Sequence, residues 1–270
     1  MKIKPFLKWA GGKYRLLDTI LRELPQGSRF VEPFAGSAAV YLNAPYARAL
    51  VCDVNNDLIS LYSAIQEEGE PFIKHCQSFF RPENNTRERF YELRELYNKA
   101  DDSRMRGALL LYLNRHAFNG LVRYNSRGGY NVPFGRHKKP YFPLQELRAF
   151  HSKARTTVTE FAARDFRQVF HELEPGDVVY CDPPYAPLSH TPSFTAYAGA
   201  GFGASDQKEL AFLAAQAWER GIPVILSNHD TKSARDLYAK AAIKQFKVQR
   251  YISRDAAKRI AVPEMLAIYR

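Results

Sequence analysis

Val-Val-Tyr-Cys-Asp-Pro-Pro-Tyr, residues 178–185, is the stretch that predicts the centre of the fold. Its first four residues are β-branched, aromatic or cysteine, which is typical of a strand buried on both faces. Neither proline has a backbone N–H, so strand pairing must stop at Asp182. Because open parallel sheets bind ligands just outside the carboxyl ends of their strands, Asp182 is expected to face a ligand from a loop that packs no core. The alternative is a surface Pro-Pro turn that Asp182 initiates.

Strands and helices alternate on either side of this stretch, which predicts an α/β fold. Apolar runs predict strands at 29–32, 49–52, 157–161 and 223–227, and a closing antiparallel pair at 244–252 and 265–269. Apolar periodicity and helix-start signals predict helices at 13–24, 39–43, 57–99, 105–115, 165–174, 206–220 and 233–241. Asp206, followed by Glu209 three residues later, is expected to cap one of these helices. The aperiodic segment 186–204 is expected to be a lid or a substrate clamp.

Two glycine-containing loops and one acid suggest a nucleotide-like ligand. Lys-Trp-Ala-Gly-Gly-Lys at 8–13 contains a Gly pair that lets backbone approach a ligand closely. Pro-Phe-Ala-Gly-Ser-Ala at 33–38 joins a predicted strand to a predicted helix, a junction that suits a phosphate or nucleotide. Asp53 lies 17 positions after Gly36, where βαβ units place a carboxylate on ribose hydroxyls. Each signal alone is also compatible with an ordinary turn.

Positive charge is concentrated in one part of the chain. The 270 residues carry a formal charge of +11, yet Ser103 to Gln145 contains no Asp or Glu. That stretch contains eight basic residues: Arg104, Arg106, Arg115, Arg123, Arg127, Arg136, Lys138 and Lys139. It also contains Phe118, Tyr124, Tyr130, Phe134, Tyr141 and Phe142. Such a mixture is expected of a surface that contacts phosphates and stacks on bases, although a solvated basic face is the alternative.

Composition excludes several other classes of protein. The chain is long enough for one large α/β domain or for a core domain with an insertion. Its three cysteines are widely separated and contain no Cys-x-x-Cys pair, so we expect a reduced cytoplasmic protein with no metal site. No apolar run approaches the ~20 residues of a membrane span, and the N-terminus does not look like a signal peptide. We therefore expect a soluble protein.

Taken together, the motifs resemble those of the Dam-type DNA adenine-N6 methyltransferases. The resemblance rests on Lys-Trp-Ala-Gly-Gly-Lys, Phe-Ala-Gly at 34–36, Asp53 and Asp-Pro-Pro-Tyr, in that order. It extends to Leu-Asn-Arg-His-Ala-Phe-Asn-Gly-Leu at 113–121, Asn-Val-Pro-Phe-Gly-Arg at 131–136 and Ser-Asn-His-Asp-Thr at 227–231. The family implies a seven-stranded Rossmann-like sheet that binds S-adenosylmethionine, an inserted and mainly helical recognition lobe, and methylation of adenine in duplex GATC by base flipping. The implied catalytic domain is 1–54 with 146–270, and the implied lobe is 55–145. We expect a monomer.

The resemblance also implies roles for individual residues. Asp182 and the carbonyl of Pro183 would accept hydrogen bonds from the adenine amino group, and Tyr185 would stack on the base. Lys13 would pair with the methionine carboxylate and Asp53 with the ribose. The implied cofactor-binding residues are Trp9, Lys13, Phe34, Gly36, Asp53 and Asp182. The implied DNA-binding residues are Lys8, Phe118, Asn119, Leu121, Arg123, Asn125, Pro133, Arg136, Lys138 and Lys139.

Some residues have no role in the implied chemistry, two depart from the family pattern, and other functions remain alternatives. The chemistry needs no metal and no Ser, Cys or His nucleophile, so Cys181, His229 and Asp230 are expected to be structural. Ala38 replaces a glycine that the family usually has, which is compatible if its φ is negative. Phe118 replaces a tyrosine and loses only a hydroxyl. A methyltransferase acting on RNA or on another DNA sequence is the nearest alternative, and a catalytically silent DNA-binding protein is another.

Overall fold

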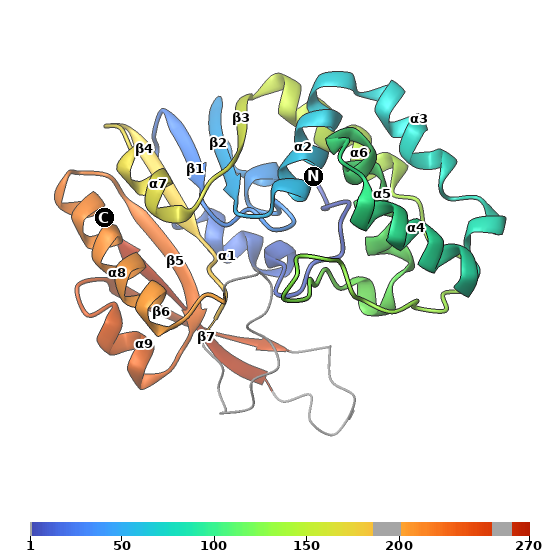
Figure 1. Ribbon diagram of the computed structural model, residues 1–270. Coiled ribbons are helices and arrows are strands. Elements are labelled where there is room, and N and C mark those ends of the chain that lie inside the picture. The colour runs from blue at the N-terminus through green and yellow to red at the C-terminus, as the bar shows by residue number, and fades with distance from the viewer. Residues whose placement is uncertain (1, 186–200, 250–260) are drawn as a thin grey trace.

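The computed structural model describes residues 2–185, 201–249 and 261–270, and shows one seven-stranded sheet with helices on both faces (Figure 1). The strands are β1 (Arg29–Glu32), β2 (Arg48–Asp53), β3 (Val158–Ala163), β4 (Asp177–Cys181), β5 (Val224–His229), β6 (Ala242–Gln249) and β7 (Ala261–Tyr269). The α-helices are α1 (Leu17–Leu21), α2 (Asn56–Glu68), α3 (Glu70–Ser78), α4 (Arg87–Lys99), α5 (Ser103–His116), α6 (Leu144–Thr156), α7 (Phe166–His171), α8 (Ala204–Glu219) and α9 (Lys232–Leu237). Short 3-10 helices lie at Lys13–Leu16, Tyr41–Asn43, Pro82–Asn84 and Phe118–Gly120. In these described ranges, no helix has the length and apolarity to cross a membrane.

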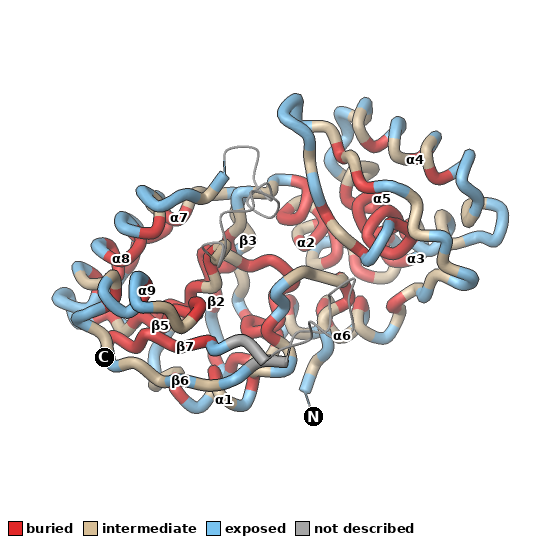
Figure 2. The backbone as a smooth tube through the Cα atoms, turned by 90° about the horizontal axis from the view of Figure 1, so that it is seen from below, coloured by how far each residue is buried: buried red, intermediate tan, exposed pale blue. Residues whose placement is uncertain are grey.

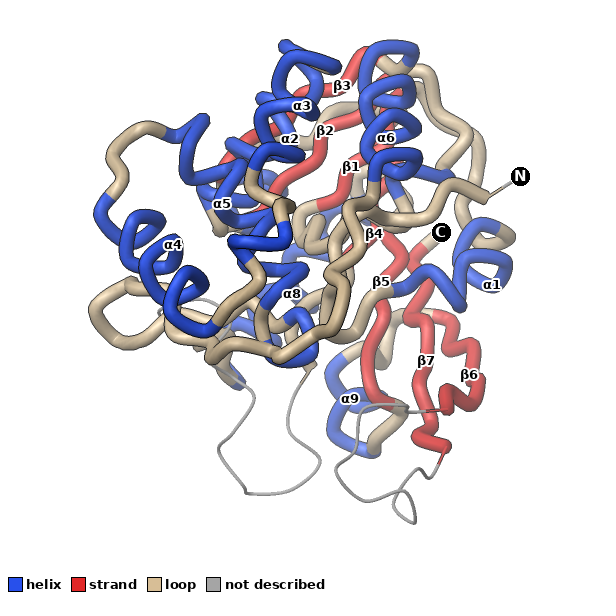
Figure 3. Tube along the Cα trace, turned by 90° about the vertical axis from the view of Figure 1, so that its right-hand side faces the viewer, coloured by secondary structure: helices blue, strands red, loops and turns tan. Residues whose placement is uncertain are grey.

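The strand order places one edge of the sheet in position to bind a ligand. The order is β3-β2-β1-β4-β5-β7-β6, and Figure 3 shows it running from β3 at the top to β6 below. The first five strands are parallel, whereas β7 runs antiparallel to both β5 and β6. The chain builds outward from β1 to β3 and then returns to the other side of β1 with β4. Ligands of such sheets bind at this reversal, outside the carboxyl ends of β1 and β4.

Alternate residues of the central strands enter two separate cores. Val178 and Tyr180 belong to the hydrophobic cluster on the face of α2 and α6, and Val179 and Cys181 to the cluster on the face of α7 and α8. All five residues of β4 are buried. The strand β5 is buried along its length, and Figure 2 draws it in red. The prediction of a strand buried on both faces is confirmed.

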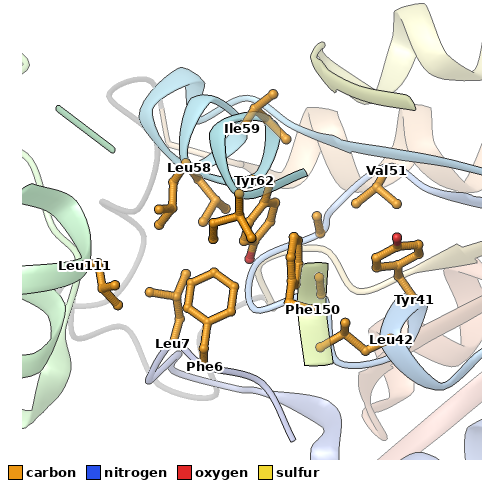
Figure 4. Close-up of a cluster of buried hydrophobic side chains, with 14 of the residues drawn as sticks. Phe6, Leu7, Tyr41, Leu42, Val51, Leu58, Ile59, Tyr62, Leu111 and Phe150 are labelled. Carbon is orange, nitrogen blue, oxygen red and sulfur yellow. The ribbon is translucent and has the colours of Figure 1, made fainter. Parts of the chain in front are cut away.

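Helices α2 to α6 all lie between β2 and β3 in the chain. Two of them cover the sheet, because Tyr62 of α2 and Phe150 of α6 both contact Phe161 of β3, at 5.6 Å and 5.7 Å between ring centroids. The ring of Phe6 contacts both from the N-terminal segment, at 5.8 Å and 5.1 Å (Figure 4). Helices α3, α4 and α5 lie beyond this layer, away from the sheet (Figure 1). At Gly107, α5 approaches α2 so closely that a Cβ would lie 3.1 Å from the Leu61 Cα.

Three predictions about local structure are wrong. The helix expected at 39–43 is only the 3-10 turn Tyr41–Asn43, and the helix expected to reach residue 24 ends at Leu21. Asp206 does not cap its helix from outside, because α8 already begins at Ala204. Instead its carboxylate reaches back to accept a hydrogen bond from the Gly203 N–H at 2.7 Å. The lid expected at 186–204 lies, except for its last four residues, outside the described residues.

Candidate functional site

The Asp182 carboxylate lies directly after β4 and is paired with a buried lysine. The Lys13 Nζ lies 2.7 Å from Asp182 Oδ1 and donates to the Gly11 carbonyl at 2.8 Å. The side chains are 6% and 20% exposed for Lys13 and Asp182, so both charges are largely removed from water. Burial raises the pKa of Asp182 above its usual value, and the Lys13 ammonium opposes that rise. Lys13, expected on a cofactor carboxylate, here contacts the acid expected to be catalytic.

Tyr185 forms a wall beside this ion pair. The Lys13 Nζ lies 4.8 Å from the centroid of the Tyr185 ring, a cation–π distance. The His229 ring meets the Tyr185 ring edge-on at 4.6 Å, and the Tyr185 hydroxyl lies 3.4 Å from a Glu264 carboxylate oxygen. Burial raises the pKa of the neighbouring Cys181 thiol well above its usual value. A thiol held protonated in this way is a poor nucleophile, which agrees with a structural role for Cys181.

The loop after β1 is held by the acid that ends β2. Asp53 accepts hydrogen bonds from the Gly36 N–H through Oδ2 and from the Asn55 N–H through Oδ1, both at 3.0 Å. The Tyr62 hydroxyl donates to the Gly36 carbonyl from α2. Trp9 packs directly on Gly36, because a Cβ there would lie 2.6 Å from Trp9 Nε1. Trp9, Gly36 and Asp53 are therefore brought together from three parts of the chain.

Ala38 adopts a backbone conformation that its side chain disfavours. Its φ is +56°, in the left-handed region, so the expectation of a negative φ is wrong. The turn is closed by the Ala38 N–H, which donates to the Ala35 carbonyl at 2.7 Å. An alanine in this region costs about 1–2 kcal/mol relative to the right-handed conformation. The surrounding loop, tied to Asp53 and Tyr62, holds it there.

Phe34 and Glu32 complete the inner surface of the site. Phe34 stacks on Phe166 at 5.5 Å and meets Phe202 edge-on at 5.6 Å. Glu32 is buried at the end of β1, and its Oε2 accepts a hydrogen bond from the Tyr41 N–H at 3.2 Å. Burial raises the pKa of Glu32, and the negative charges of Asp182 and Asp53 raise it further. Sequence reasoning missed Glu32 and Phe166, although Glu32 stands last in a predicted strand.

The acidic side chains of the site fit a cofactor with net positive charge. Glu32, Asp53 and Asp182 place three interacting carboxyl groups at the carboxyl edge of the sheet, and Lys13 pairs with Asp182. The charges of these side chains favour a cofactor that carries net positive charge. The aromatic faces of Trp9 and Phe34 add apolar walls next to the acids, as in most cofactor sites.

Several of the residues expected to bind DNA lie beside α5. Asn114 of α5 holds Lys8 in place, since its Oδ1 accepts from the Lys8 N–H at 2.9 Å and its Nδ2 donates to the Lys8 carbonyl at 2.8 Å. The same amide also donates to the Gly120 carbonyl at 2.8 Å. Lys8 and the turn Phe118–Gly120, more than 100 residues apart, are thus fixed side by side. Phe118 is 45% exposed, an uncommon exposure for a phenylalanine.

The segment from Leu121 to Arg136 is an irregular loop that folds back on itself. Tyr124 and Tyr130 form an antiparallel bridge within it, and Phe134 forms another with Ala117, which precedes the loop. Arg123 is exposed, and its Nε donates to the Asn131 Oδ1 at 2.7 Å. Arg136, Lys138, Lys139 and Pro133 are exposed on the same connection. Leu121 is half-buried, and its carbonyl accepts a hydrogen bond from the Tyr130 hydroxyl.

Asn125 and Asn119, two of the implied DNA-binding residues, also fix the backbone of this part of the chain. The Asn125 Oδ1 accepts hydrogen bonds from the Arg127 N–H at 2.9 Å and the Gly129 N–H at 3.0 Å, which closes the tip of the loop. Asn119 has a φ of +55°, a conformation that Asn tolerates better than most residues. Both side chains lie at exposed positions that a nucleic acid could reach.

Three of the eight basic residues do not belong to a free basic surface. Arg106 forms a two-bond ion pair with Asp57 at 2.6 Å and 2.7 Å, and Arg104 pairs with Glu68 at 2.8 Å. Arg115 is buried and donates to the Phe6 carbonyl. The stretch 103–145 lacks acids in sequence but receives two from α2 in space, so these three arginines, none of which is among the implied DNA-binding residues, do not add to its basic surface.

Comparisons with known proteins agree on one family. A family model described as D12 class N6 adenine-specific DNA methyltransferase matches residues 9–252. A "DNA adenine methylase" of Vibrio cholerae serotype O1 is 47% identical over 269 residues, covering 99% of this chain and 96% of that protein. The "DNA adenine methylase" of Serratia marcescens is 47% identical over 270 residues, covering 100% and 99%. That of Escherichia coli (strain K12) is 46% identical over 269 residues, covering 100% and 96%.

Proposed function

This chain belongs to the D12 class of N6 adenine-specific DNA methyltransferases, and from that membership we propose its target, its methyl donor and its site residues. The proposed reaction transfers the methyl group of S-adenosylmethionine to adenine N6 in duplex GATC, after the adenine is flipped out of the helix. The observation that best supports it is the Asp-Pro-Pro-Tyr loop at 182–185. This loop follows β4 where the strand order reverses, with Lys13 against its carboxylate.

The proposed chemistry follows from the poor nucleophilicity of the adenine amino group, whose lone pair is delocalised into the ring. Asp182 and the Pro183 carbonyl accept hydrogen bonds from its two N–H groups, so that the nitrogen lone pair is freed for attack. The N–C bond would form as the S–C bond of the sulfonium breaks, and one amino proton would be lost. The rigid prolines keep both acceptors aimed, and Lys13 favours the ionised form of Asp182. S-Adenosylmethionine supplies an electrophilic methyl group on its sulfonium. Tyr185 stacks on the flipped base, which is worth about 1–3 kcal/mol.

The remaining assignments divide the chain between donor and DNA. We assign Trp9, Lys13, Phe34, Gly36, Asp53 and Asp182 to the cofactor, and residues 1–54 with 146–270 to the catalytic domain. Residues 55–145 are assigned to a DNA-recognition lobe, and the enzyme is taken to act as a monomer on double-stranded DNA. Flipping costs a few kcal/mol, which the exposed ring of Phe118 offsets by filling the vacated stack, with Asn119 beside the orphaned base.

A methyltransferase for RNA or for another DNA sequence would use the same chemistry with another reader. The experiment that separates them incubates the protein with methyl-labelled S-adenosylmethionine and three substrates: duplex DNA containing GATC, duplex DNA lacking it, and RNA of matching sequence. Label is expected in the first substrate, at least a hundredfold above the others. Equal labelling of the two duplexes would refute the sequence assignment, and preferential labelling of RNA would refute the DNA assignment. A silent DNA-binding protein would bind duplex without labelling it.

Binding to DNA is expected to depend strongly on salt. With three basic residues of the stretch committed to internal contacts, Arg123, Arg127, Arg136, Lys138 and Lys139 remain for DNA. Each neutralised phosphate contributes about −0.9 to the slope of log K against log salt, so four or five contacts give a slope of about −3.6 to −4.5. The measurement is fluorescence anisotropy of a labelled duplex at increasing salt. A slope near zero would contradict a basic docking surface.

Substitutions of Arg123 and Lys138 are expected to have different effects on methylation. Arg123 must leave Asn131 to reach a guanine, where its guanidinium can bond O6 and N7 together. Arg123→Ala is therefore expected to lose about 1–3 kcal/mol of transition-state stabilisation on duplexes that contain GATC. On a duplex altered at that guanine it is expected to lose little. Lys138→Ala is the matched control: it should weaken all sequences alike and flatten the salt slope by about one. Methylation kinetics on GATC and on singly substituted duplexes decide the matter. A uniform loss for Arg123→Ala would mean that it contacts phosphate and reads no base.

A further inference from the structure

The Asp-Pro-Pro-Tyr loop cannot be fixed by its own backbone donors. Pro183 and Pro184 have no N–H, so the two positions between Asp182 and Tyr185 cannot donate to any neighbouring strand. A side chain supplies a fixing point instead. The Nε2 of Gln207, in the first turns of α8, donates to the Pro184 carbonyl at 2.8 Å. Gln207 is only 7% exposed, so this hydrogen bond is shielded from water.

The orientation of the Gln207 amide is itself fixed from the far side. Its Oε1 accepts from the Nδ2 of Asn228 at 3.2 Å and from the hydroxyl of Tyr238 at 3.3 Å. Asn228 lies on β5, the strand paired with β4, and its own Oδ1 accepts from the His229 N–H at 2.8 Å. With two donors facing Oε1, the amino group of Gln207 must point to the Pro184 carbonyl. Asn228 and Tyr238 are buried as well.

We propose that Gln207 is a positioning residue for methyl transfer, which holds the Asp182 carboxylate and the Pro183 carbonyl in line with the target nitrogen. Asn228, from the Ser-Asn-His-Asp stretch at 227–230, acts through Gln207. The inference rests on the proposed function. A loop with two prolines transmits a displacement at Pro184 directly to Pro183 and Asp182, because few rotations remain to absorb it. A misplacement of about 1 Å can slow an enzyme by about a hundredfold.

The alternative is that Gln207 contributes only to stability, as any buried and bonded amide does. The two roles differ in what they change. If Gln207 positions the loop, its substitution slows the chemical step and leaves the binding of DNA and cofactor unchanged. If Gln207 only stabilises the fold, its substitution lowers the unfolding temperature without slowing the folded enzyme. The chain contains a matched control in Gln66 of α2, whose Nε2 donates to the carbonyls of Ala154 and Thr159 at 3.1 Å and 2.9 Å.

The test compares Gln207→Glu with Gln66→Glu. Each change keeps the shape of the side chain and replaces the amide donor with a carboxylate oxygen, which cannot donate a hydrogen bond to a carbonyl unless it is protonated. Single-turnover methyl transfer is measured with the enzyme in excess over duplex DNA and with saturating S-adenosylmethionine, together with the Kd of each ligand and the unfolding temperature. We expect Gln207→Glu to slow transfer by about tenfold to a hundredfold with both Kd values within about threefold of wild type. We expect Gln66→Glu to transfer at the wild-type rate within about threefold.

The outcomes separate the inference from the function on which it rests. If wild type fails to methylate duplex DNA, the proposed function fails. If wild type is active and Gln207→Glu transfers within threefold of it, the positioning role is refuted. An equal slowing by Gln66→Glu would also refute it, because any lost buried donor would then suffice. Gln207→Met, which has no donor and no charge, replaces Gln207→Glu if the carboxylate prevents folding, and the same slowing is expected.

Discussion

Asp182→Asn is expected to lower the rate of methyl transfer by about a thousandfold or more. The amide keeps the shape of the carboxylate but loses its negative charge, and one of its two oxygen acceptors becomes a donor. Removing one preorganised group that stabilises charge in a transition state typically slows an enzyme by about a hundredfold to a thousandfold. Here the change also disturbs the pairing of Lys13 with Oδ1 at 2.7 Å. The measurement is single-turnover transfer to duplex DNA.

Asp230→Asn is the matched control for that change. Asp230 follows the neighbouring strand β5, and its carboxylate pairs with Arg235 at 2.6 Å. We expect it to keep activity within about threefold. If Asp182→Asn keeps activity within tenfold of wild type, its assignment is wrong. Asp182→Ala removes the carboxylate that pairs with the buried Lys13 ammonium. We expect Asp182→Ala to unfold at a lower temperature than Asp182→Asn.

Arg106→Met is expected to destabilise the protein by about 3 kcal/mol, because it leaves the buried Asp57 carboxylate without its partner. The Tyr97 hydroxyl donates to the same carboxylate and cannot replace a positive charge. For a chain of this size the loss corresponds to a fall of roughly 6–12 °C in Tm. The measurement is thermal unfolding followed by circular dichroism.

Arg104→Met, two residues earlier on α5, is the matched control. Arg104 pairs with Glu68, but both side chains are about a third or more exposed. Exposed ion pairs contribute about 1 kcal/mol or less, so a fall of no more than about 4 °C is expected. If the two variants lose the same stability, burial does not distinguish the two pairs, and the division of the basic stretch into internal and free residues is wrong.

The centre of the fold was predictable because its physical signal is local. A parallel strand buried on both faces requires a continuous apolar run, and residues 178–181 supply one. Two prolines then end pairing whatever the rest of the chain does. Asp182 and Asp53 could be placed at the same edge of the sheet for the same reason, since parallel strands bring their carboxyl ends together.

Other features depend on contacts between distant residues and left no local signal. The partners of Arg104 and Arg106 come from α2, 36 and 49 residues earlier, so the charge of their own stretch was misleading. The positive φ of Ala38 follows from a loop held by Asp53, whereas an alanine by itself favours a negative φ. Gln207 lies in an ordinary amphipathic helix, and only its hydrogen bond to the Pro184 carbonyl identifies it as a candidate positioning residue.

The most direct test of the central claim identifies the methylated atom. A GATC duplex is incubated with the protein and methyl-labelled S-adenosylmethionine, digested to nucleosides and analysed by mass spectrometry. A second duplex carries purine, which lacks the amino group, in place of the GATC adenine of both strands. We expect one labelled product, N6-methyldeoxyadenosine, from the first duplex and none from the second. Label on another base, or equal label in the purine duplex, would contradict transfer to the adenine amino group at the Asp182 site.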